Sequence, residues 1–247
     1  MVKILIILLT GTVAGFLNTV AAGGTLIAIP ILIFLGLPSA VANGTNRIAL
    51  ILESIVGVTN FKRKGYFDSK FGLILGIPAV IGSIIGARIA IELPDHVFNK
   101  IFALIMILVI GFIVWDSKRK VKESKDIITK KQKIISGILF FFVGIYGGVI
   151  QAGIGFIIIL ALTVTTDFSL TKINSLKVFV VAMYIIPSLL VFVVNGKVEW
   201  LLGLTLALGN GIGAYIGSNF AVNKGDKYIK VILIIAVAIM AVKLIIS

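Results

Sequence analysis

The sequence contains no cysteine, and only 13% of its 247 residues are charged. The absence of cysteine excludes a disulfide framework, a thiolate nucleophile and a cysteine metal site. The scarcity of charge excludes a water-soluble fold, because soluble domains carry about a quarter charged residues whereas this chain is 59% apolar. A mean hydropathy of +1.17 indicates lipid as the solvent, with room for about eight to ten membrane helices.

Enzyme motifs are absent as well. The single histidine, His96, lies in a polar loop, and the sequence has no HExxH motif and no phosphate-binding GxxxxGK[ST] motif. Glu53 is an intramembrane acid without an evident catalytic partner. We therefore expect no enzyme activity, no catalytic residue, no metal and no cofactor, which leaves transport or membrane assembly as the main functional classes.

Apolar runs recur along the chain, and each is predicted to form a helix because an open strand cannot satisfy its backbone in lipid. The runs cover 4–17, 25–36, 44–61, 71–91, 97–115, 133–150, 155–166, 173–194, 200–222 and 228–246. The predicted fold class is an all-α polytopic membrane protein.

The formal net charge of +13 comes mainly from connectors between these runs. The largest basic segment, at 116–133, carries eight basic and three acidic residues. Basic connectors of this kind indicate membrane topology rather than nucleic-acid binding. We expect the linker 116–132 to lie in the cytoplasm, with binding of lipid headgroups as an alternative role.

The two halves of the chain resemble each other at a nearly constant shift. A shift of 130 or 131 residues aligns GSIIGARIA (82–90) with GAYIGSNFA (213–221), Thr45 with Ser175, and Arg47 with Lys177. The sequence therefore predicts two membrane repeats, 1–115 and 133–247, joined by the linker.

The charge of equivalent loops changes between the repeats. Loop 62–70 is basic and its counterpart 195–199 is neutral, whereas 92–95 is acidic and its counterpart 223–230 is basic. Because basic loops favour the cytoplasm, this exchange predicts inverted repeats with an odd number of crossings each and both chain ends outside.

The first two runs of each half are predicted to be too short for comfortable membrane crossings. Runs 4–17 and 25–36 hold 14 and 12 residues, which extend about 21 and 18 Å as helices against an apolar core of about 30 Å. A glycine-containing break separates them, and QAGIG at 151–155 marks the equivalent place in the second half. We predict a short broken-helix hairpin plus three spanning helices in each repeat.

Polar residues near the breaks and at matched repeat positions are candidate ligands for an anion, because they supply cations and hydrogen-bond donors. The predicted substrate-binding residues are Asn18, Thr45, Asn46, Arg47, Gln151, Asn174, Ser175 and Lys177. The alternative for the two cations is snorkelling to lipid headgroups. The alternative for Asn18 and Gln151 is capping of freed backbone groups.

Other residues have more open roles. Glu53 is predicted to be either a proton-coupling carboxylate or the salt-bridge partner of a neighbouring helix. Close approach of the backbone to a ligand is expected at Gly23, Gly24, Gly153 and Gly155. Helix packing is expected at Gly82, Gly86, Gly213 and Gly217, which have small-xxx-small spacing. Arg88 and Glu92 are predicted to form a surface ion pair.

Three segments resemble the TauE/SafE family of sulfite and organic-anion exporters. They are AGFLNTVAAGGTLIAIPILIFLGLPSAVANGTNRIALILESIVGVTNFKRKGYFD (14–68), IYGGVIQAGIGF (145–156) and NGKVEWLLGLTLALGNGIGAYIGSNFA (195–221). The resemblance covers nearly the whole chain. It implies a multi-pass transporter of the plasma or inner membrane, with export of sulfite, sulfoacetate or related anions.

The sequence thus predicts a secondary transporter that exports a small sulfur-containing or organic anion by alternating access between the repeats. The expected partners are this anion and the lipid bilayer, and no nucleic acid. An assembly subunit and, with less support, an intramembrane enzyme are the alternatives. Substrate identity, transport direction, coupling ion and oligomeric state do not follow from the sequence.

Overall fold

The computed structural model describes residues 2–21, 23–63, 65, 68–116 and 128–221, which form helices joined by short turns. The helices are α1 (Val2–Ala21), α2 (Thr25–Phe34), α3 (Ser39–Arg63), α4 (Ser69–Glu92), α5 (Asp95–Asp116), α6 (Lys130–Val149), α7 (Ile154–Thr165), α8 (Leu170–Val194) and α9 (Trp200–Ala221). Each coincides with a predicted run, which confirms the all-α fold class. The predicted run 228–246 lies outside the described residues.

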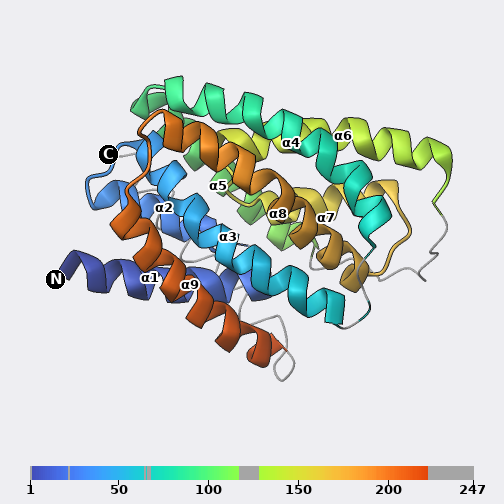
Figure 1. Cartoon of the computed structure of the whole chain (residues 1–247), viewed down its shortest axis with the longest axis horizontal. Coiled ribbons are helices and arrows are strands. Elements are labelled where there is room, and N and C mark those ends of the chain that lie inside the picture. Colours follow the sequence, from blue (N-terminus) through green and yellow to red (C-terminus); the bar gives the residue numbers. More distant parts are fainter. Residues whose placement is uncertain (1, 22, 64, 66–67, 117–127, 222–247) are drawn as a thin grey trace.

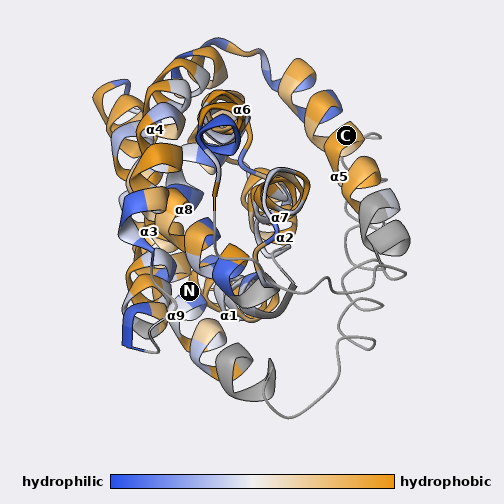
Figure 2. Cartoon of the chain, turned by 90° about the vertical axis from the view of Figure 1, so that its right-hand side faces the viewer, coloured by the Kyte–Doolittle hydropathy of each residue, from blue (hydrophilic) through white to orange (hydrophobic). Residues whose placement is uncertain are grey.

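Four of these helices contain a segment long and apolar enough to cross a bilayer, namely α1, α4, α6 and α8. Large apolar side chains remain exposed on their outer faces, for example Ile77, Ile81 and Ile85 along α4. In Figure 2, much of the ribbon of the outer helices has the colour of hydrophobic residues. This distribution is that of a bundle whose outer solvent is lipid, which confirms a multi-pass membrane protein.

The long helices form a continuous row in the order α1, α9, α3, α8, α4 and α6, in which each helix packs against the next (Figure 1). The short helices α2 and α7 lie in the middle of the molecule, between this row and α5 (Figure 2). The row therefore interleaves the two halves of the chain, because α1 packs on α9 and α6 packs on α4.

Pairs of glycines set the direction of packing at the two ends of the row. Gly11 and Gly15 of α1 lie against Leu206 and Asn210 of α9. From the first of these contacts to the second, the residue number rises by four in both helices, so α1 and α9 run parallel. At the other end of the row, Gly82 of α4 lies against Phe141 of α6, and Gly86 lies against Ile145. The residue number again rises by four in both helices, so α4 and α6 run parallel.

The two central helices run in opposite directions. Gly44 of α3 lies against Phe192 of α8, and Gly57 lies against Val178. Because the residue number rises along α3 where it falls along α8, the two helices are antiparallel. The outer contacts extend this pattern, because α3 runs parallel to α9 and α8 runs parallel to α4 (Figure 1).

The predicted packing role of glycine is confirmed for Gly82, Gly86 and Gly213. A Cβ atom at Gly82 or Gly86 would lie 2.1 Å from a carbonyl oxygen of α6, and one at Gly213 would lie 1.9 Å from the carbonyl oxygen of Thr12. Such distances leave no space for a methyl group, so these glycines allow the helix backbones to touch. The contacts of Gly217 lie outside the described part of the structure.

The prediction of a short first helix in each half is wrong, because α6 has 20 residues as α1 does. Helix α1 has 20 residues and extends about 30 Å, enough to cross the apolar core. The helix continues past the apolar run because the polar side chains at its end have hydrogen-bond partners. The Thr19 hydroxyl donates to the Gly15 carbonyl at 2.8 Å. The Asn18 amide has partners on other segments, among them Glu53. The predicted shortness holds for α2 and α7, which have 10 and 12 residues.

The predicted ion pair between Arg88 and Glu92 is also wrong. Both side chains are exposed on α4, and the ion pair found among the described residues is instead Lys172 with Asp68, at 3.6 Å. A pair of exposed side chains gains little from contact, because water screens the attraction and ordering both chains costs entropy.

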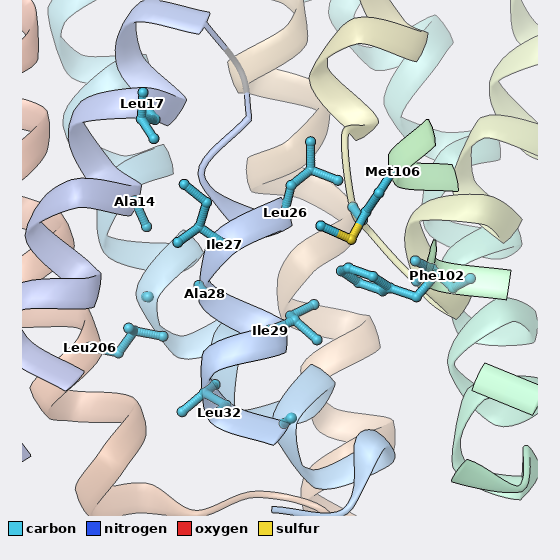
Figure 3. Packing of buried hydrophobic residues seen from close by; sticks show 14 of the residues in the cluster. Ala14, Leu17, Leu26, Ile27, Ala28, Ile29, Leu32, Phe102, Met106 and Leu206 are labelled. Atoms are coloured by element: carbon cyan, nitrogen blue, oxygen red, sulfur yellow. The ribbon is translucent and has the colours of Figure 1, made fainter. Parts of the chain in front are cut away.

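The apolar core fixes the position of α2. Figure 3 shows Leu26 and Ile29 of α2 facing Phe102 and Met106 of α5, while Ile27 faces α1. All four of the residues at the α2–α5 contact are fully buried. This packing holds the start of α2, and the break before it, deep within the bundle.

Candidate functional site

The break between α6 and α7 is a tight turn with a strained backbone. Gln151 has φ of +63° and Gly153 has φ of +65°. Gln151 is the one residue other than glycine with positive φ in the part of the chain that the structure describes. A side chain in this left-handed region costs about 1 to 2 kcal/mol, so the turn holds Gln151 in place at an energetic cost.

The amide of Gln151 is buried and has no partner. The residue is 0% exposed, and neither Nε2 nor Oε1 forms a hydrogen bond within the described structure. A buried amide without partners costs about 1 to 3 kcal/mol. Strain and unpaired polar atoms at one residue are typical of a ligand site rather than of a structural turn.

Two side chains of α3 satisfy the last carbonyl groups of α6. The Arg47 guanidinium donates from Nη2 to the carbonyls of Gly148 at 2.6 Å and Gly147 at 3.1 Å. Asn43 donates from Nδ2 to the carbonyl of Val149 at 2.7 Å. The carbonyl end of a helix carries partial negative charge, so a cation at this position stabilises the broken helix inside the membrane.

Arg47 is enclosed on its other sides too. Its Nη1 atom donates to the Ser188 hydroxyl at 2.8 Å, and its guanidinium lies 4.6 Å from the centroid of the Phe192 ring. The residue is 0% exposed, so the snorkelling alternative is wrong for Arg47. Its Nε atom has no hydrogen-bond partner among the described residues, so this N–H can donate to a ligand.

Two tyrosines border this break. The hydroxyl of Tyr184, on α8, interacts electrostatically with Arg47 and lies near the Gln151 amide, but it forms no hydrogen bond of normal geometry within the described structure. The Tyr146 hydroxyl donates to the carbonyl of Ala152 and so braces the turn. Unpartnered polar atoms of Gln151, Arg47 and Tyr184 therefore gather at one buried place, which we call the α6–α7 polar site.

The break between α1 and α2 is built differently. The Asn18 side chain accepts a hydrogen bond from the Gly24 backbone N–H at 2.6 Å and donates to the Glu53 carboxylate at 2.9 Å. Asn18 therefore has the backbone-capping role that was its predicted alternative. The capping alternative does not hold for Gln151, whose amide stays unpaired.

Glu53 lies among polar groups from several helices. Asn210 of α9 lies near its carboxylate, and Lys177 of α8 attracts it electrostatically. Within the described residues no salt bridge at contact distance joins Glu53 to a neighbouring helix, so the predicted salt-bridge alternative is not formed. We call Glu53, Asn18, Asn210 and Lys177 the α1–α2 polar cluster.

The structure does not bring Arg47 and Lys177 together. Arg47 contacts α8 at Ser188, which follows Lys177 by 11 residues and so lies about 16 Å further along the helix. The two cations also differ in surroundings, since Arg47 is fully enclosed and Lys177 is half-buried. Each cation belongs to its own helix break.

The remaining predicted residues lie in several environments. The Thr45 hydroxyl accepts from the backbone N–H of Glu199 at 2.9 Å, which ties α3 to the loop before α9. Asn46 and Ser175 are buried, and the Nδ2 of the first and the Oγ of the second have no partner in the described structure. Asn174 is half-buried on α8.

The glycines at the breaks are all buried, and two of them have a clear packing role. A Cβ atom at Gly24 would lie 2.0 Å from the carbonyl oxygen of Ala14, and one at Gly153 would lie 2.7 Å from the side chain of Val109. These two positions need glycine so that each hairpin can fold back on its neighbours. Close approach to a ligand at Gly23 and Gly155 stays a prediction.

Sequence reasoning left Tyr184, Ser188 and Asn210 out of the predicted site. Tyr184 and Asn210 are polar residues inside apolar runs, which is a weak indication of a buried role. The sequence gives no indication of a site role for Ser188. A serine in a membrane helix commonly donates to a backbone carbonyl of its own helix, and Ser188 donates to that of Ile185.

Comparison with known proteins assigns the chain to a family. The model of the family described as "Sulfite exporter TauE/SafE" matches residues 7–244, nearly the whole sequence. This chain belongs to the TauE/SafE family. The family resemblance found in the sequence segments is thereby confirmed, and the match includes both helix breaks.

Similar curated proteins are named as membrane transporters. The chain is 27% identical to the probable membrane transporter protein ORF9 of Sinorhizobium sp, over 94% of this chain and 88% of that protein. It is 25% identical to a probable membrane transporter protein of Haemophilus influenzae, over 97% and 93% of the two chains. It is 28% identical to the probable membrane transporter protein YfcA of Escherichia coli strain K12, over 94% and 85%. No solved structure matches the chain significantly.

These findings establish a TauE/SafE membrane transporter family protein built as a multi-pass helical bundle. Transport proteins of this kind bind a small molecule within the membrane. The chemistry of the α6–α7 polar site, with amide, hydroxyl and guanidinium donors, suits an anion or another strong hydrogen-bond acceptor.

Proposed function

We propose that this protein is a secondary transporter that exports a small sulfur-containing or organic anion, and that the anion binds at the α6–α7 polar site. The observation that carries the proposal is the unpaired amide of Gln151, held at 0% exposure on a strained backbone. A bound oxyanion would accept hydrogen bonds from this amide, from the Tyr184 hydroxyl and from Nε of Arg47.

The proposed site extends to Asn46, Asn174 and Ser175, which line the approach to it in this hypothesis, whereas Lys177 belongs to the α1–α2 polar cluster and acts on the anion through its charge at a distance. Asn46 and Ser175 support it because each has a buried polar atom without a partner in the described structure. Thr45 and Asn18 already bind backbone or side-chain groups of the protein. Their contribution to the substrate is therefore indirect, through the position of the helices.

We propose alternating access as the mechanism, by motion of the two halves about the breaks. The helix directions support inverted repeats, because α1, α3 and α9 run one way and α4, α6 and α8 the other. Thus α1 opposes its sequence counterpart α6, and α3 opposes α8. A binding site at a helix break between inverted halves can open to either side of the membrane in turn.

The membrane potential can drive this export. A divalent anion that leaves a negative-inside cell gains about 4 to 5 kcal/mol per 100 mV, at about 2.3 kcal/mol per charge. The sequence has no ATP-binding motif, so ion gradients, the membrane potential or the substrate gradient supply the energy in this proposal.

The test is a flux assay on the full chain in proteoliposomes, with sulfite, thiosulfate, sulfoacetate, taurine and simple carboxylates as candidate substrates. We expect flux of a sulfur oxyanion or sulfonate in the wild type and at least a tenfold loss in Tyr184→Phe, because one good hydrogen bond to a charged group contributes about 1.5 to 3 kcal/mol. The variant removes only the hydroxyl, so packing around the ring is kept.

The matched control is Tyr215→Phe on α9, whose side chain is 71% exposed. It should keep wild-type flux because its hydroxyl lies away from the buried site. Equal loss in both variants, or full flux in Tyr184→Phe, would place the anion elsewhere. Wild-type liposomes with no flux of any tested anion would contradict the proposed function itself.

A further inference from the structure

The two helix breaks carry different chemistry. The α6–α7 polar site has buried donors without partners, whereas the α1–α2 polar cluster has a carboxylate that is held by hydrogen bonding. Four helices contribute to this cluster: Glu53 comes from α3, Asn18 from α1, Asn210 from α9 and Lys177 from α8. A carboxylate, a cation and two amides thus converge at a place that substrate binding at the other break does not use.

Lys177 is balanced by Glu53. Among the described residues, Lys177 forms no ion pair at contact distance, and the acid that attracts it is Glu53. The groups that face Glu53 from the packed helices are Asn18, Asn210 and Lys177, of which Lys177 alone is charged. With Glu53 ionised the cluster is close to neutral, and with Glu53 protonated it carries one uncompensated positive charge.

Asn18 links the state of Glu53 to the backbone of the break. Its amide nitrogen donates to Glu53 at 2.9 Å, while its amide oxygen accepts from the N–H of Gly24 at 2.6 Å, directly before α2. A hydrogen bond to a carboxylate is about twice as strong as one to a neutral group. Protonation of Glu53 therefore weakens the tie that joins α3 to the start of α2.

We propose that Glu53 is a proton-binding site of the transporter, and that its protonation leaves Lys177 as an uncompensated cation, so that a proton and the substrate anion bind together and move in the same direction. The inference rests on the proposed function, because it assigns the coupled ion to the same transport cycle. No bond other than that of the proton to the Glu53 oxygen forms or breaks.

The expected size of the effect follows from Coulomb's law. One unit charge that appears about 16 Å from the anion, in surroundings with an effective dielectric constant of about 20, changes the affinity about fivefold for a monovalent anion and about thirtyfold for a divalent one. Thermodynamic reciprocity requires that anion binding favours proton uptake by the same factor. For a divalent anion, one accompanying proton reduces the exported charge to one, which the membrane potential still drives outward.

The experiment measures binding of sulfoacetate to the purified full chain in detergent, at one pH just below neutral and one above it. Sulfoacetate is chosen because its charge stays constant over this interval, unlike that of sulfite. We expect about thirtyfold tighter binding of this dianion at the lower pH, together with proton uptake from a weakly buffered solution when sulfoacetate is added. Glu53→Gln should bind sulfoacetate equally at both pH values and take up no proton.

The matched control is Glu92→Gln, which neutralises an exposed carboxylate at the end of α4 and should behave as the wild type does. Glu53→Asp keeps a carboxyl group and should retain the proton uptake even where Glu53→Gln folds poorly. Proton uptake and pH dependence that persist in Glu53→Gln would overturn the inference.

A measurement without any anion separates this inference from the proposed function. The infrared difference spectrum of the substrate-free protein between the two pH values should contain a band of a protonated carboxyl group that is missing in Glu53→Gln. Such a band in a protein that transports none of the tested anions would support the proton site and contradict the proposed function. An identical band in the variant would assign the proton to another residue.

Discussion

Gln151 combines two features that proteins normally avoid, a left-handed backbone at a residue other than glycine and a buried amide without partners. Each costs free energy, and nothing within the described structure recovers it. Residues of this kind persist where function requires them. Stability and transport should therefore respond in opposite directions when Gln151 is replaced.

Gln151→Gly should raise stability and abolish transport. Glycine adopts φ of +63° without the penalty of about 1 kcal/mol that a side chain incurs, and the unpaired amide is removed. We expect an increase of about 1 kcal/mol in the free energy of unfolding, measured by chemical denaturation in detergent. Sulfite should stabilise the wild type by mass action and leave the variant unchanged.

The control for this substitution is Gly153→Ala in the same turn. It places a Cβ atom at φ of +65° and 2.7 Å from the Val109 side chain, so it should lower stability. A variant Gln151→Gly that is less stable than the wild type would show that the amide supports the fold rather than the substrate.

Some of these residue roles could be predicted from sequence and others could not. Polar residues inside apolar runs indicate buried sites, and Arg47, Asn18 and Glu53 are indeed enclosed or hydrogen-bonded. Their partners could not be predicted, because the acceptors of Arg47 are backbone carbonyls some 100 residues away in sequence. Every residue has a backbone carbonyl, so the sequence does not show which carbonyl accepts a hydrogen bond from Arg47.

Among the helices, α4 and α6 pack by direct contact of backbone on backbone. A Cβ atom at Gly144 would lie 2.2 Å from the carbonyl oxygen of Ala79, and one at Gly148 would lie 2.3 Å from that of Ser83. Close contact of this kind stabilises helix pairs in lipid, where apolar side chains gain nothing by leaving the solvent. It also brings the carbonyl end of α6 within reach of Arg47 on α3.

Gly144→Ala should separate α4 from α6. Overpacking of a close contact costs about 1 to 3 kcal/mol, and we expect that loss in the free energy of unfolding together with reduced flux. The matched control is Gly137→Ala in the same helix, where the nearest atom would lie 3.7 Å from the new Cβ. That variant should keep both stability and flux, and equal effects in the two would contradict the packing role.

The boundaries of the helices followed from the apolar runs to within a few residues, except that α3 begins five residues before its predicted run, at Ser39, and that α1 ends four residues after its own. Hydrophobicity ended the predicted helix at residue 17, but the observed helix ends at Ala21. The difference arises because Asn18 and Thr19 satisfy their polar groups with Glu53 and with the preceding turn. Such partners become known only when the other helices are in place.

In the whole molecule, the last residue of α3, Arg63, and the last residue of α8, Val194, lie at opposite ends of the bundle, because these two helices are antiparallel (Figure 1). Such an exchange was predicted from the charges of loops 62–70 and 195–199. The side of the membrane on which each loop lies stays a prediction.

The natural absence of cysteine allows a direct test of this topology. Lys70→Cys and Glu199→Cys each introduce a single thiol at an exposed position. In intact cells, a membrane-impermeant maleimide should label Glu199→Cys at once and Lys70→Cys only after permeabilisation, because basic loops face the cytoplasm. Labelling of both thiols from the same side would contradict the inverted arrangement.

The pairing of α1 with α9 has a consequence for biosynthesis. The ribosome completes α1 at Ala21 and α9 at Ala221, so 200 residues separate the two ends. At about 5 to 20 residues per second, α1 waits for about 10 to 40 seconds before its partner helix exists. During that time the glycine face of α1 meets lipid or the insertion machinery, and neither half of the chain can complete its own packing before the other has been made.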